Sequence, residues 1–165
     1  MKPLTLLLLL IMTTACAKTH KEASDLRNQA QRGFWSKSIS ENYRRLYADV
    51  MIDIQREVLA CYGGGPVKGS RPGSGSNFST TTFFPHFNRD DKNYSATVSI
   101  WRGRGADAAA KYAKGKSRVM FVVDIKGSRD GRSGVTVFGP RRGWNDEMQA
   151  FLYWAGGGKG QCSWH

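Results

Sequence analysis

Apolar residues recur at steps of three and four between residues 43 and 61, a spacing that draws one apolar stripe along a helix. The stripe consists of Tyr43, Leu46, Tyr47, Val50, Ile54, Val58 and Cys61. Ser38 and Glu41 precede it with the spacing of a capping box, and the glycines of residues 63–66 follow it. The pattern therefore predicts a helix over residues 38–62.

Four later stretches have the alternation or composition of β-strands. Residues 94–101 alternate apolar and polar positions, which is typical of a strand with one buried face. Residues 118–126 (RVMFVVDIK) are the most apolar and are expected at the centre of the sheet. Residues 78–87 are rich in Thr and Phe, and residues 134–138 follow a Gly-rich turn as a hairpin partner.

Two further helices complete the predicted domain, a short Ala-rich one over residues 106–114 and an amphipathic one over residues 144–155. Together these elements predict one α+β domain over residues 34–165. It has a mostly antiparallel sheet of about four strands, packed with an N-terminal and a C-terminal helix. The preceding segment, residues 16–33, is polar and contains one Leu, so it is expected to be a flexible, partly helical tether.

The first residues have the pattern of an export signal. Lys2 is followed by an apolar run over residues 4–12 that is too short to span a bilayer. Residues 13–16 (TTAC) resemble the lipobox of bacterial lipoprotein precursors, and this resemblance covers about a tenth of the chain. It implies that residues 1–15 are removed as a signal peptide and that Cys16 is lipidated, anchoring the protein to a membrane.

The residues after the signal refine the expected location. By the same resemblance, Ala17 directs the protein to the outer membrane, facing the periplasm. The alternative is ordinary signal cleavage after Ala17, which would secrete the same domain without an anchor. In either compartment Cys61 and Cys162 are expected to form a disulfide, because thiols outside the cytoplasm usually pair.

Basic residues outnumber acidic ones, and their excess lies in one region. Lys2 is the only charged residue of the export segment, so 24 of the 25 basic residues remain against 13 acidic ones, a net charge of +11. If the basic loops share one end of the sheet, they form a patch that suits phosphate or carboxylate groups. The predicted patch consists of Trp101, Arg102, Arg104, Lys111, Lys114, Lys116, Arg129, Arg132, Arg141, Arg142 and Trp144. The alternative is a set of basic turns that keep strand edges soluble.

Two nucleotide-binding patterns occur in contexts that argue against them. Residues 103–108 (GRGADA) and Asp124 match a dinucleotide fingerprint, but too few residues follow for a doubly wound sheet. Residues 110–117 (AKYAKGKS) match a relaxed phosphate-binding loop, yet they lead into a strand rather than a helix. No cofactor is therefore expected.

The sequence predicts a non-enzymatic, membrane-anchored lipoprotein whose basic surface binds an anionic envelope component or a partner protein; nucleic acid is not expected as a ligand. One alternative is a periplasmic inhibitor or immunity-type protein. Another is a hydrolase that uses Cys61, with His86 as a base, or the adjacent carboxylates Asp90 and Asp91. The histidines and cysteines have no zinc-ligand spacing, so no metal site is expected.

Overall fold

Six strands form one antiparallel sheet in the order β1-β6-β5-β4-β3-β2. They are β1 (Ser36–Tyr43), β2 (Val67–Lys68), β3 (Thr80–Asp90), β4 (Ser95–Arg104), β5 (Arg118–Gly127) and β6 (Ser133–Pro140). The structure is a computed structural model that describes residues 22–33, 35–63, 67–68, 80–160 and 162. Because β2 has only two residues, the sheet consists of five long strands and a short edge strand.

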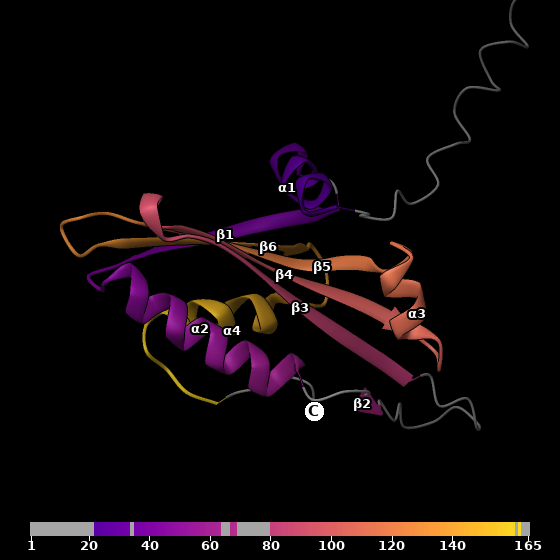
Figure 1. The fold of residues 1–165 in the computed structure, drawn as a ribbon. Helices are drawn as coiled ribbons and strands as arrows, with labels where there is room; N and C mark the ends of the chain where they lie inside the picture. The colour runs from indigo at the N-terminus through magenta and orange to yellow at the C-terminus, as the bar shows by residue number, and fades with distance from the viewer. Residues whose placement is uncertain (1–21, 34, 64–66, 69–79, 161, 163–165) are drawn as a thin grey trace, which may run out of the picture.

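In the described part of the chain, four α-helices accompany the sheet: α1 (Ala23–Arg32), α2 (Tyr47–Tyr62), α3 (Ala108–Ala113) and α4 (Asn145–Ala155). Helices α2 and α4 cover one face, α1 lies on the other, and α3 connects β4 to β5 at one end (Figure 1). The predicted α+β class and its N-terminal and C-terminal helices, here α2 and α4, are confirmed. None of the described helices is long and apolar enough to cross a membrane.

The main core lies between the sheet and the two helices α2 and α4. The alternation predicted for residues 94–101 places Val98 and Ile100 in this core, where both are fully buried. Ile54 of α2 and Phe151 of α4 pack against the same face of the sheet and are also fully buried. This packing is the main source of the fold's stability, since burial of apolar area dominates folding energetics.

A smaller core lies on the opposite face, beneath α1. In the β4–β5 ladder Ile100 pairs with Phe121 and Trp101 pairs with Val119, so one extra residue of β5 stands between them. This bulge lets Val119 join Val122 on the face that α1 covers, where both pack against Leu26.

The predicted helix over residues 38–62 is wrong in its first part. Residues 36–43 form β1, which pairs with β6, and α2 begins only at Tyr47. Ser38 is therefore opposite Phe138 in the sheet and does not cap a helix. The local pattern failed because β1 depends on a partner strand about a hundred residues away.

Helix α1 occupies the second half of the segment expected to be a tether. Leu26 is fully buried against the sheet, and Arg27 Nε donates to Asp124 Oδ2 of β5 at 2.8 Å. Gly33 ends the helix in the left-handed conformation, with φ 69°. The folded part of the chain therefore begins before residue 34. The predicted signal peptide and the predicted lipidation site at Cys16 lie outside the described residues.

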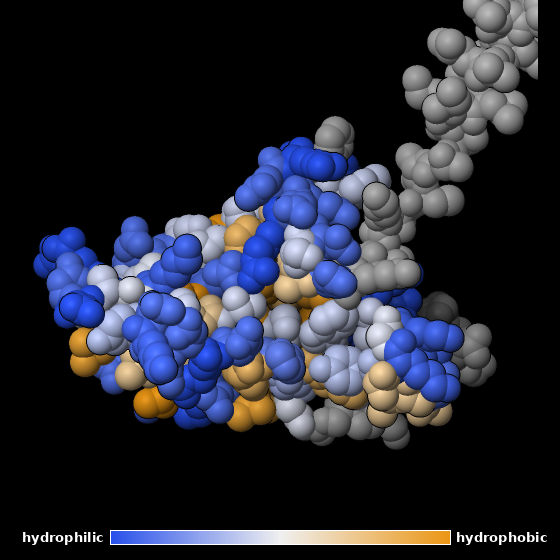
Figure 2. All heavy atoms as spheres, turned by 45° about the horizontal axis from the view of Figure 1, so that its top comes forward, coloured by the Kyte–Doolittle hydropathy of each residue, from blue (hydrophilic) through white to orange (hydrophobic). Residues whose placement is uncertain are grey.

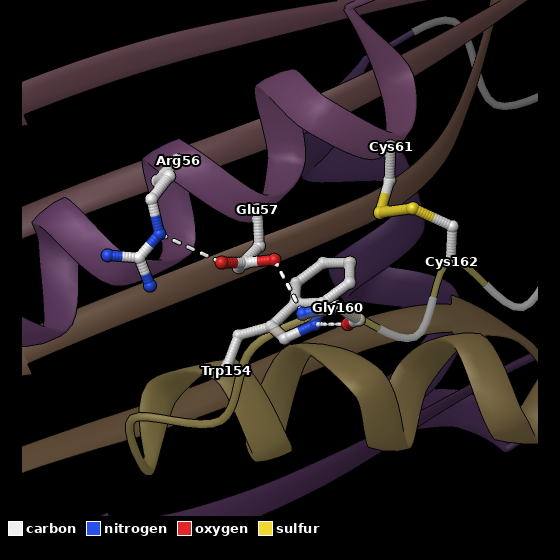
Figure 3. Close-up of a disulfide and its surroundings, with 6 residues drawn as sticks. All are labelled: Arg56, Glu57, Cys61, Trp154, Gly160 and Cys162. Carbon is white, nitrogen blue, oxygen red and sulfur yellow. Dashed lines mark hydrogen bonds and ion pairs between the residues drawn. A yellow bond between two sulfur atoms is a disulfide. The ribbon is translucent and has the colours of Figure 1, made fainter.

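The C-terminal tail folds back onto α2 (Figure 3). A disulfide joins Cys61 at the end of α2 to Cys162 in the tail, which confirms the predicted pairing. Glu57 is 6% exposed and accepts a hydrogen bond from the backbone N–H of Gly160 at 2.9 Å. The indole Nε1 of Trp154 donates to the carbonyl of Gly160 at 2.7 Å, so both helices hold the tail.

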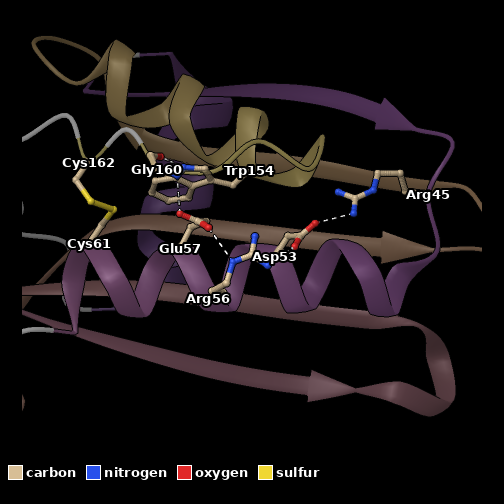
Figure 4. Close-up of polar contacts among 8 residues, drawn as sticks. All are labelled: Arg45, Asp53, Arg56, Glu57, Cys61, Trp154, Gly160 and Cys162. Carbon is tan, nitrogen blue, oxygen red and sulfur yellow. Dashed lines mark hydrogen bonds and ion pairs between the residues drawn. A yellow bond between two sulfur atoms is a disulfide. The ribbon is translucent and has the colours of Figure 1, made fainter.

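Next to the contact between α2 and the tail, a row of ion pairs lies along α2 (Figure 4). Arg56 contacts Glu57 through Nε and Asp53 through Nη1, both at 2.8 Å. Arg45 donates to Asp53 at 2.6 Å and to the carbonyl of Ala155 at 2.7 Å. The network thus links the start of α2 to the end of α4.

Candidate anion-binding site

Five basic side chains line a cavity of about 380 Å³ where β4, α3 and β5 meet. We call this cavity the cationic pocket. Its lining consists of Arg102, Gly103 and Arg104 of β4, Lys111 of α3, Lys116 and Ser117 of the following connection, and Arg118 and Met120 of β5.

Sheet geometry brings two of these cations together. Arg102 and Arg118 are directly opposite each other in the β4–β5 ladder, so their side chains leave the sheet on the same face. On its other side Arg102 is opposite Phe83, which belongs to the core beneath α2 and α4. The pocket therefore continues that face beyond the end of the core. Like charges in this position are destabilising unless an anion lies between them.

Burial and neighbouring positive charges both affect the pKa of Arg102. Its burial, followed by the positive charges of Arg104 and Arg118, lowers its pKa. An arginine nevertheless stays protonated in proteins, so these effects raise the free energy of the ion rather than neutralise it. The guanidinium carbon lies 5.9 Å from the ring centroid of Trp144, a cation–π contact that offsets part of this cost.

Two buried polar atoms of the pocket lack a hydrogen-bond partner within the described part of the chain. They are Nε of Arg102 and Oγ of Ser117, a residue that is 4% exposed. A buried polar group without a partner costs about 1–3 kcal/mol.

Asp107 supplies a counter-charge to one of the five cations, Lys111. Its Oδ1 lies 2.8 Å from Nζ of Lys111, and the hydrogen bond from Lys111 lowers the pKa of Asp107. The other four basic side chains of the pocket form no ion pair with any residue that the structure describes. The pocket thus has five cations against one paired carboxylate, which is the charge balance of an anion-binding site.

The pocket unites part of the predicted basic patch. Four predicted residues line it: Arg102, Arg104, Lys111 and Lys116. Trp144 adjoins it through the ring contact with Arg102, and Lys114 is exposed in the same connection. The prediction missed Arg118 and Ser117. The strand register places Arg118 opposite Arg102, and Ser117, the residue before β5, lines the same cavity.

The other predicted residues lie elsewhere, so the basic loops do not all share one end of the sheet. Arg129 and Arg132 are in the β5–β6 turn, at the far end from α3 (Figure 1). Figure 2 shows hydrophilic side chains gathered over both of these ends. Arg141 donates to the carbonyl of Gly33, and Arg142 is exposed between β6 and α4.

Trp101 lies on the α1 face, where its ring meets the ring of Tyr112 edge-on, with centroids 6.0 Å apart.

The residues proposed for hydrolysis have structural partners. Cys61 is in a disulfide and has no free thiol. Asp90 accepts hydrogen bonds from Asn93, and Asp91 pairs with Arg89 at 3.1 Å. Within the described ranges, no group of three or more His, Cys, Asp and Glu residues could hold a metal ion.

Packing explains the glycine pattern of residues 103–108. A Cβ on Gly103 would lie 2.8 Å from the Cβ of Ala108, so glycine allows α3 to approach β4 closely. Asp124, the residue expected to bind a ribose, is instead paired with Arg27. Comparison of the chain with protein-family models and with curated proteins finds no match.

Proposed function

We propose that the protein is an exported, membrane-anchored envelope lipoprotein that binds an anionic component of the envelope in its cationic pocket and catalyses no reaction. The observation that carries this proposal is the pocket itself. Its five cations face one cavity, and two buried polar atoms there have no partner among the described residues. Such an arrangement lowers stability on its own and is favourable once an anion occupies it.

Sequence features support the location. The apolar segment and the lipobox-like residues 13–16 favour export and lipidation of Cys16. A disulfide between Cys61 and Cys162 is compatible with an oxidising compartment. From Cys16 to Glu22 the chain reaches at most about 3.6 Å per residue, so an anchored domain would stay close to the membrane surface.

Calorimetric titration of the purified mature protein with inorganic polyphosphate tests the binding function. We expect saturable binding that weakens as salt rises from 50 to 200 mM, roughly the range over which the Debye length falls below 10 Å. The double variant Arg102→Ala/Arg118→Ala should lose this binding.

The double variant Arg129→Ala/Arg132→Ala is the matched control, because it removes the same charge at the opposite end of the sheet. It should retain most of the binding. Equal losses in both variants would show that overall charge, not the pocket, holds the polyanion, and the proposal would fail.

Labelling with radioactive palmitate in a bacterial host tests the anchor. The wild-type protein should incorporate label and fractionate with membranes, whereas Cys16→Ser should remain unlabelled. If the wild-type chain is released unlabelled with Lys18 as its first residue, cleavage after Ala17 is correct instead.

A further inference from the structure

We infer that the cationic pocket recognises the dianionic phosphate of a phosphomonoester carried by a larger polar molecule. This inference rests on the proposed function and specifies its ligand. It starts from the pair formed by Arg102 and Arg118, whose side chains leave adjacent strands on the same face.

The donors of the pocket suit a phosphate better than a carboxylate. Two guanidinium groups from opposite positions can converge on one anion. Nε of Arg102 and Oγ of Ser117, both buried in residues that line the pocket, have no hydrogen-bond partner among the described residues. A monoester phosphate presents three acceptor oxygens and nearly two negative charges at neutral pH, whereas a carboxylate presents two oxygens and one charge. The phosphate therefore satisfies more of these donors at once.

The charge of the pocket supports a doubly charged ligand. Among the residues that the structure describes, an ion pair is formed by only one of the five cations, Lys111, with Asp107. The volume of about 380 Å³ lies within the range of small-molecule sites, which is about 300–1,000 Å³, and far exceeds what one phosphate group fills. The cavity thus has room for part of the molecule that bears the phosphate.

The ionisation of the ligand gives a test that does not depend on the protein's own titration. The charged groups that face the site are Arg102 and Arg104 of β4, Lys111 of α3 with Asp107, Lys116 of the connection and Arg118 of β5. The hydrogen bond from Lys111 lowers the pKa of Asp107, so this carboxylate keeps its charge over the range of the test. A monoester phosphate, in contrast, gains its second charge with a pKa of about 6.

We therefore expect glycerol 3-phosphate to bind the mature protein up to about tenfold more tightly at pH 7.5 than at pH 5, because the fraction of dianion rises by about that factor. Dimethyl phosphate, a singly charged diester, and acetate should bind weakly, with no increase over the same range. Arg102→Lys and Ser117→Ala should each weaken binding of the monoester about tenfold, because each removes a donor while the net charge of the pocket stays the same. Arg129→Lys is the control and should leave it unchanged.

Vesicles distinguish the possible sources of the phosphate. Binding to phosphatidic acid but not to phosphatidylglycerol would assign a lipid monoester, and binding to glycerol 3-phosphate with neither vesicle would assign a soluble one; both support the inference. If all three soluble anions bind alike and without pH dependence, the phosphate inference fails while the proposed function stands. If none of these anions and no polyphosphate binds, the phosphate inference and the proposed binding function both fail. Circular dichroism confirms that each variant is folded.

Discussion

Arg102 on β4 and Arg118 on β5 stand directly opposite each other in the antiparallel ladder, two positive charges on one face of the sheet. Such a pair is unfavourable by about 0.2–1 kcal/mol relative to a neutral pair. The structure keeps it at a place where Nε of Arg102 is also without a hydrogen-bond partner among the described residues. Stability and anion binding therefore oppose each other at this site.

Replacing Arg118 with Gln should raise stability while it weakens binding. The exposed position of Arg118 limits any loss of packing, so we expect the free energy of unfolding to rise by about 0.2–1 kcal/mol without ligand. Urea denaturation measures this change. Arg132→Gln, at an exposed arginine paired with Asp130, is the control and should give no increase. A less stable Arg118→Gln protein would show that the charges do not repel each other significantly.

Glu57→Gln should destabilise the attachment of the C-terminal tail. The carboxylate is almost completely buried and accepts hydrogen bonds from Arg56 and from the N–H of Gly160. An amide cannot accept both bonds with equal strength, so a loss of about 1–3 kcal/mol is expected in urea denaturation. Asp49→Asn on the exposed side of the same helix is the control, and its effect should stay within about 0.5 kcal/mol.

The carboxylate of Glu57 also makes the free energy of unfolding depend on pH. The hydrogen bond from Arg56 lowers the pKa of Glu57 below its ordinary value of 4.5. Burial acts in the opposite direction, and the N–H of Gly160 lowers the pKa further. Burial alone would raise the pKa of Asp53, but its contacts with Arg45 and Arg56 lower it below 3.8. Both groups therefore stabilise the fold above their unfolded pKa values, and this stabilisation is lost as the pH falls through the folded values.

We expect the free energy of unfolding to fall steadily from about pH 4.5 towards pH 3. The loss should be smaller in Glu57→Gln, which cannot be protonated at this position. Glu147 acts in the opposite direction, because its burial raises its pKa and acid then favours the folded state. A wild-type profile as flat as that of Glu57→Gln would contradict the role given to Glu57.

Leu26→Ala should show that α1 is part of the folded domain. The side chain is fully buried against Val119 and Val122, and removal of a buried leucine typically costs about 2–5 kcal/mol. Asn28→Ala, at an exposed position of the same helix, should change stability by less than about 0.5 kcal/mol. If Leu26→Ala has no larger effect than this control, α1 does not contribute to global stability.

Loss of the disulfide should reduce stability by about 2–5 kcal/mol. The bond joins residues 101 positions apart, so it restricts a large part of the unfolded chain. The double variant Cys61→Ser/Cys162→Ser, compared with the wild-type protein by urea denaturation, measures the effect. Unchanged midpoints would indicate that the contacts of Glu57 and Trp154 hold the tail without help.

The sequence predicted the elements whose patterns are local. The strict alternation around Val98 and the apolar run of β5 placed two central strands correctly. It failed at β1 because Ser38 and Glu41 have the spacing of a capping box although both lie in a strand. The choice between helix and strand depends on pairing with β6, which a local pattern does not contain.

The candidate site was predicted in part for a similar reason. Composition identified the basic region, and four of its residues do line the pocket. The contribution of Arg118 depends on the strand register, and the bulge between Ile100 and Trp101 shifts that register by one residue. Composition could not separate these residues from Arg129 and Arg132, because the β5–β6 hairpin carries that pair to the other end of the sheet.

The position of β1 has a consequence for the order in which the protein folds. Among the described elements β1 is the first strand and lies at an edge of the sheet, and its ladder partner, β6, is the last strand. A chain that emerges with its N-terminus first therefore holds β1 unpaired until residues 133–140 have appeared. Pairing over such a separation slows folding and leaves a strand edge open to other chains meanwhile. An accessory protein that shields β1 during this interval would raise the yield of folded protein without changing its final stability.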